Sequence, residues 1–151
     1  MSLHGAAVFE KLFPLAHKHN LRIVSVYRRG YSPSSGFDED ELKGIGYGKK
    51  FDEAKSFLRG LGIEVATFLV KFATEQDIPL TDWDTRTGGI ALIGWSLASI
   101  HILALLAFAD ELPEGSRSTL QKYLHTVLSH GETAVCFETI INILITCAIP
   151  F

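Results

Sequence analysis

Ser96 is the residue of this chain best placed to do chemistry, because of the segments on either side of it. Two glycines precede the apolar run Ile90 to Ile93, which is typical of a strand buried on both faces of a sheet. The residues from Leu97 to Ala109 are apolar nearly all round, which is typical of a helix packed deep against a sheet. The pattern predicts a strand, a sharp turn and a helix. A serine in such a turn exposes its hydroxyl at a helix N-terminus, where free N–H groups favour negative charge.

The residues two before and two after Ser96 are the small residues Gly94 and Ala98, which would let the strand and the helix approach closely. This stretch resembles the G-x-S-x-G nucleophile elbow of the α/β-hydrolase superfamily, with alanine in the last position. The resemblance implies that Ser96 is the nucleophile of an acyl-transfer reaction and that the backbone N–H of Leu97 binds the oxyanion. The alternative is that Ser96 caps the helix, since serine is a favoured N-cap residue.

A second oxyanion donor is implied near the N-terminus. The segment Leu3 to Ala7, which contains His4-Gly5, resembles the start of the loop after the third strand of the same superfamily. That resemblance implies that the backbone N–H of Ala6 faces the developing oxyanion. One such donor is worth roughly 3–4 kcal/mol of the barrier. The alternative is a chance His-Gly pair in a disordered terminus.

A serine nucleophile also needs a base. In the superfamily that this chain resembles, the acid and the histidine follow the serine after later strands, and the chain ends about where those strands would begin. His125 and His130 come after Ser96 and could lie at the carboxyl edge of the sheet, and Glu132 is the acid near them. His130 is the candidate base, although it is out of the superfamily's order. His101 lies one turn along the helix and is expected to point into packing or toward a backbone acceptor.

Other segments supply the frame for these residues. Leu21 to Tyr27 is rich in β-branched residues and predicts a strand. Arg29-Gly30, just after it, resembles the Arg-Gly of a loop in the same superfamily and is interpreted as a structural clamp with no catalytic part. The alternative is an ordinary polar turn. The acidic run Gly36 to Glu41 lacks the ligand spacing of a calcium loop and is interpreted as a solvated helix start.

Residues Phe51 to Gln76 carry apolar side chains at steps of three and four, which predicts an amphipathic helix. Gly60 and Gly62 would each weaken it by about 1 kcal/mol relative to alanine and would permit a bend. Ser116 to Tyr123 predicts a polar helix, and Tyr123 to Leu128 predicts another parallel strand. Strands that alternate with helices imply parallel pairing with helices on the faces of the sheet.

Composition narrows the class of protein. The net charge of −3 gives no sign of nucleic-acid binding, which favours a basic surplus. Cys136 and Cys147 have no zinc or redox spacing and are interpreted as reduced thiols, and no metal or cofactor is expected. Residues Met1 to Gly5 do not resemble a signal peptide, so a cytoplasmic location is expected.

The resemblance covers roughly Leu3 to Leu128. The expected fold is therefore α/β: a partial α/β-hydrolase domain over residues 1–128, with a short, mostly parallel sheet of three to four strands flanked by helices. Residues 129–151 form an apolar tail of unassigned role, which could be a core helix, an edge strand or an exposed segment. The tail is shorter than the ~20 residues that a membrane-spanning helix needs.

The expected function is that of a serine hydrolase acting on a small acyl or ester substrate. The chain lacks the usual acid and histidine, so it could be inactive by itself. Two alternatives stay open: a non-catalytic module of the same fold that binds a small ligand or a partner, and a membrane-associated protein held by the apolar tail. The sequence predicts no oligomeric state.

Overall fold

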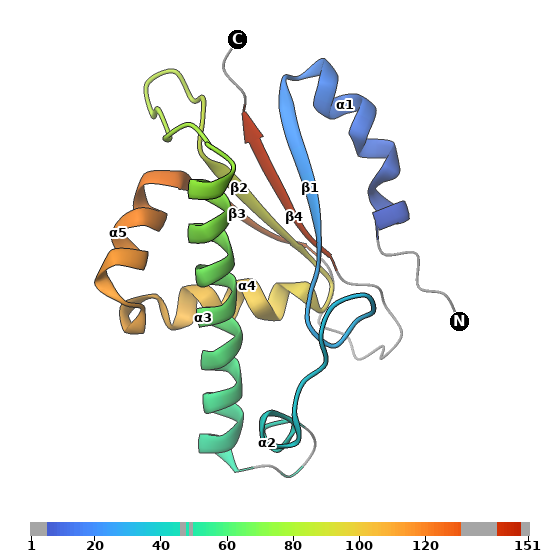
Figure 1. The fold of residues 1–151 in the computed structure, drawn as a ribbon, viewed down its shortest axis with the longest axis vertical. Coiled ribbons are helices and arrows are strands. Elements are labelled where there is room, and N and C mark those ends of the chain that lie inside the picture. Colours follow the sequence, from blue (N-terminus) through green and yellow to red (C-terminus); the bar gives the residue numbers. More distant parts are fainter. Residues whose placement is uncertain (1–5, 46–47, 49, 131–141, 149–151) are drawn as a thin grey trace.

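A four-stranded sheet with helices on both sides organises the part of the chain that the structure describes (Figure 1). The structure is a computed structural model, and it describes residues 6–45, 48, 50–130 and 142–148. The helices are the 3-10 helix η1 (Ala6–Leu12), α1 (Phe13–Lys18), α2 (Glu39–Leu42), α3 (Phe51–Glu75), α4 (Ala98–Ala107), the 3-10 helix η2 (Ala109–Glu111) and α5 (Glu114–Tyr123). The strands are β1 (Leu21–Tyr27), β2 (Ile90–Trp95), β3 (Leu124–His130) and β4 (Asn142–Ala148). The fold class is thus mixed α/β, as predicted.

The strand order is β1-β4-β2-β3, and β4 lies inside the sheet. β4 runs antiparallel to both of its neighbours, with Ile145 opposite Val24 of β1 and Leu92 of β2. β2 and β3 are parallel, so β1, β2 and β3 all point the same way. The expectation of a mostly parallel sheet is correct for the direction of these three strands. It is wrong for their pairing, because the reversed strand β4 separates β1 from β2.

The predicted tail therefore contributes to the sheet. β3 continues through Ser129 to His130, so a boundary after Leu128 falls inside a strand. Residues 142–148 pair with two strands of the preceding part of the chain. Residues 131–141, which include Cys136 and Glu132, lie outside the described part.

The hydrophobic core lies between the sheet and α3, α4 and α5, which gather on one side of the strands in Figure 1. Its largest fully buried side chains are Leu69 of α3, Ile90 and Leu92 of β2, and Ile102 of α4. On the other side, α1 lies against β1. α1 has Pro14 in its first turn, where proline is tolerated because the N–H it lacks would have no partner within the helix.

The crossing of α3 and α4 depends on Gly62. A β-carbon at Gly62 would lie 2.7 Å from the carbonyl oxygen of Ala104, so only glycine lets the two backbones come this close. Gly60, in the same helix, has open space around the corresponding position. α3 is one continuous helix through both glycines, so Gly62 serves the packing of two helices.

Gly62→Ala is expected to destabilise the protein by about 1–3 kcal/mol, because the added methyl group forces the two helices apart. Gly60→Ala is the matched control and should stabilise it by up to about 1 kcal/mol, since alanine is the better helix former and meets no neighbour. Urea unfolding followed by circular dichroism measures both variants. Equal stabilisation by the two substitutions would contradict the assigned helix contact.

Candidate functional site

The turn at Ser96 has the geometry that the sequence predicts. β2 ends at Trp95, Ser96 and Leu97 form a turn, and α4 begins at Ala98. The φ angle of Ser96 is 57°, in the left-handed region that residues other than glycine seldom adopt. Such strained backbone is concentrated at functional sites, where the surrounding structure holds it in place. Ser96 is partly exposed.

The close approach of β2 and α4 is confirmed at Gly94. A β-carbon there would lie 2.6 Å from Cδ1 of Ile102 and 3.1 Å from the carbonyl oxygen of Ala98. The Ser99 hydroxyl donates a hydrogen bond of 3.2 Å to the carbonyl oxygen of Gly94 and so ties the helix to the strand. The small residues around Ser96 therefore fix the sharpness of the turn.

Ser96 does not serve as a helix cap. The N-cap residue of α4 is Leu97, and no side chain caps this helix within the described residues. Among these residues, no hydrogen bond uses the N–H of Leu97. That N–H lies at a helix N-terminus, where it can donate to an anionic oxygen, as the oxyanion role requires.

The predicted second donor, Ala6, is the first residue of η1. The same 3-10 helix packs beside the serine turn, because the buried ring of Phe9 meets the ring of Trp95 edge-on at 5.4 Å. Leu3, His4 and Gly5 lie outside the described residues. The structure thus brings η1 to the residue before Ser96, while the role of the Ala6 N–H remains a prediction.

The histidines that follow Ser96 lie at opposite ends of β3. The backbone N–H of Ser96 donates to the carbonyl oxygen of His130 at 2.7 Å, and the His130 ring meets Trp95 at 6.3 Å between centroids. His125 lies near the start of β3, where its ring bonds to Thr126, so the expectation that it reaches the carboxyl edge is wrong. No imidazole or carboxylate of the described residues is hydrogen-bonded to the Ser96 hydroxyl.

His101 points into the interior, as predicted. Its side chain is 4% exposed, and neither ring nitrogen has a hydrogen-bond partner among the described residues. Burial, followed by the nearby charge of Arg28, lowers the pKa of His101 to about 4. The Leu97 carbonyl opposes this shift, although it does not reach hydrogen-bonding geometry with the ring. The imidazole is therefore neutral near pH 7.

Arg28 is a functional candidate that the sequence did not reveal. Its Nε is buried without a partner in the described structure, and its guanidinium lies 4.1 Å from the centroid of the Tyr31 ring. Burial lowers its pKa. No local pattern distinguishes Arg28 from Arg29, because both leave the same end of β1.

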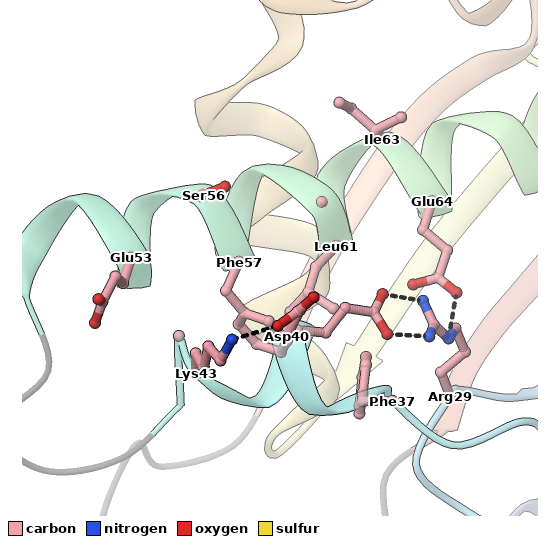
Figure 2. A pocket seen from close by; sticks show the side chains of 13 residues that line it. Arg29, Phe37, Asp40, Lys43, Glu53, Ser56, Phe57, Leu61, Ile63 and Glu64 are labelled. Atoms are coloured by element: carbon pink, nitrogen blue, oxygen red, sulfur yellow. Dashed lines mark hydrogen bonds and ion pairs between the residues drawn. The ribbon is translucent and has the colours of Figure 1, made fainter.

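Arg29 acts as a clamp between three segments (Figure 2). Its guanidinium donates to both carboxylate oxygens of Glu41, at 2.7 and 2.5 Å, and lies 3.5 Å from Glu64 of α3. It also covers the ring of Phe37 at 4.8 Å. Glu41 forms a capping box with Asp38 at the start of α2, so the acidic run is a helix start, as predicted. Arg29 and these partners line a cavity of about 580 Å³.

Other kinds of site find no support in the described residues. They hold no group of three or more histidine, cysteine or acidic side chains arranged to bind a metal. None of their helices combines the length and apolar character needed to cross a bilayer.

Comparison with protein-family models, with curated proteins and with solved structures found no significant match to this chain.

Proposed function

We propose that this chain is a serine hydrolase of the α/β-hydrolase type, with Ser96 as its nucleophile and a small ester or acyl compound as its substrate. The observation that carries the proposal is the left-handed backbone of Ser96, between β2 and α4. A nucleophile elbow needs this conformation to lift the serine oxygen out of the sheet. The N–H of Leu97, which has no hydrogen-bond partner among the described residues, supports the same proposal.

In the proposed reaction the Ser96 oxygen attacks the carbonyl carbon of an ester. The carbonyl oxygen becomes an anion that accepts hydrogen bonds from the N–H groups of Leu97 and, by prediction, Ala6. The bond to the leaving alcohol then breaks, and the alcohol takes up the proton that Ser96 lost. Water hydrolyses the acyl-serine and releases the acid.

The proton of Ser96 must pass through a base. His130 is the candidate within the described residues, because β3 holds its backbone against Ser96 at the same edge of the sheet. Its ring must turn from Trp95 toward the serine to accept the proton, so we expect slow turnover.

A fluorophosphonate probe tests the nucleophile directly, because it bonds covalently to an activated serine. Wild-type protein is expected to be labelled on Ser96, and Ser96→Ala should reduce labelling to background. Ser129→Ala is the matched control, since Ser129 is an exposed serine on neighbouring β3, and it should label like wild type. Absence of labelling in folded wild-type protein would refute the proposed nucleophile.

A second function is favoured by one observation. No imidazole or carboxylate is hydrogen-bonded to the Ser96 hydroxyl in the described structure, as a non-catalytic binding module of the same fold would show. Hydrolysis of p-nitrophenyl acetate separates the two functions. Turnover that is lost in Ser96→Ala favours the hydrolase, whereas folded protein that shows neither labelling nor turnover favours the binding module.

A further inference from the structure

A second cavity, of about 330 Å³, opens between β1, α3, β2 and α4. We call it the His101 pocket. Its volume lies at the lower end of the range for small-molecule sites, which begins at about 300 Å³. It does not include the Ser96 hydroxyl. An inference about this pocket is therefore independent of the proposed hydrolase.

His101 supplies an unpaired polar group to the pocket. Its side chain is 4% exposed, and both ring nitrogens are buried without a hydrogen-bond partner among the described residues. A neutral imidazole carries one N–H donor and one acceptor nitrogen. Buried polar groups in proteins are nearly always paired, so an unpaired ring that lines a cavity indicates a missing partner.

Arg28 supplies an unpaired positive charge to the same pocket. Its Nε–H is buried without an acceptor, and no carboxylate forms an ion pair with it in the described structure. Stacking on Tyr31, with 4.1 Å from the guanidinium to the ring centroid, holds the side chain in place. The two other charged residues of the pocket, Arg29 and Glu64, pair with each other, so they leave the charge of Arg28 uncompensated.

The rest of the lining is largely apolar. Its apolar side chains come from β1, α3 and β2: Val26, Val65, Phe68, Leu69 and Leu92. An apolar wall with a few convergent polar groups is the usual composition of a small-molecule site. The apolar side chains would contact the short hydrocarbon tail of a ligand, and the polar groups would bind the polar head group of the same ligand.

We propose that the His101 pocket binds a small monocarboxylate with an apolar body, whose carboxylate accepts hydrogen bonds from Arg28 Nε–H and the His101 imidazole. The negative charge of the head neutralises Arg28, which no protein carboxylate does in the described structure. Charge-assisted hydrogen bonds of this kind are stronger than neutral ones. The head group thus explains both unpaired side chains.

Calorimetric titration of the full chain with hexanoate, hexan-1-ol and hexanamide tests the proposal. Hexanoate is expected to bind at least about tenfold more tightly than either neutral compound, since a lost charge-assisted bond costs at least that factor. Arg28→Met should weaken hexanoate binding by about tenfold or more. Arg117→Met is the matched control, because Arg117 pairs with Glu114 on α5 outside the pocket, and its affinity should equal that of wild type.

A measurement on wild-type protein covers the case in which Arg28→Met does not fold. In nitrogen-15 spectra of the imidazoles, hexanoate should shift the His101 signals and leave those of exposed His17 unchanged. Ser96→Ala should bind hexanoate like wild type, which separates this site from the proposed hydrolase. The proposal is overturned by no binding up to about 10 mM, by equal affinity for hexan-1-ol, by unchanged affinity in folded Arg28→Met, or by unshifted His101 signals.

Discussion

Replacing Ile145 by proline is expected to abolish cooperative unfolding of the sheet. Ile145 lies in the middle of β4, opposite Val24 on one side and Leu92 on the other. Proline has no N–H to donate and is essentially confined to edge strands, strand ends and bulges. The free energy of unfolding should fall by about 3 kcal/mol or more, which is the cost of a proline in a helix interior. Thermal unfolding followed by circular dichroism measures it.

The matched control is a proline where the backbone already accepts one. Glu114 is the first residue of α5, and its N–H would have no partner within the helix. Glu114→Pro also removes only an exposed ion pair with Arg117. It should leave the unfolding temperature nearly unchanged. If Ile145→Pro is as stable as Glu114→Pro, β4 does not lie between β1 and β2.

The protein should lose stability as pH falls from about 6.5 to about 4, because of His101. Burial lowers the pKa of the folded imidazole to about 4, whereas the unfolded chain titrates near 6.5. Between these values the unfolded state binds more protons than the folded state. The contribution of His101 to the free energy of unfolding is therefore fully present above pH 6.5 and is lost as the pH falls toward 4. At about 1.4 kcal/mol for each pH unit, the free energy of unfolding falls by about 3 kcal/mol between the two pKa values.

His101→Leu isolates this effect, since carboxylates also titrate in part of the window. Glu64, whose pKa burial raises, lines the same pocket and is retained in the variant. The free energy of unfolding of His101→Leu, measured in urea across the pH range, should fall by about 3 kcal/mol less than that of wild type. His17→Leu, at an exposed histidine, should follow the wild-type curve. An equal acid dependence in wild type and His101→Leu would show that His101 titrates normally in the folded protein.

The serine turn could be predicted because its determinants lie within a few neighbouring residues. Gly94, Ser96 and Ala98 set the close approach of strand and helix, and the apolar runs on either side specify the elements themselves. β1 was predictable for the same reason: Leu21 to Tyr27 is rich in β-branched residues, which favour a strand.

The place of β4 could not be predicted in this way. The apolar residues of β4 do not indicate whether the strand runs parallel or antiparallel to its neighbours, and its partners in β1 lie almost at the other end of the chain. The register of β3 is similar: the sequence predicts a strand near His125 and His130, but pairing with β2 decides which histidine reaches the serine edge. The different environments of Arg28 and Arg29 also arise only from packing, because successive residues of an extended chain point to opposite sides and so meet different neighbours.

The inserted strand has a consequence for how the protein is made. The ribosome synthesises β1, β2 and β3 before β4. Until β4 is made, the edges of β1 and β2 that pair with it in the folded protein stay unpaired. Pairing across so much intervening chain is slow, and exposed edges favour aggregation during that interval. We therefore expect biosynthesis of this protein to depend on a holdase chaperone until β4 emerges.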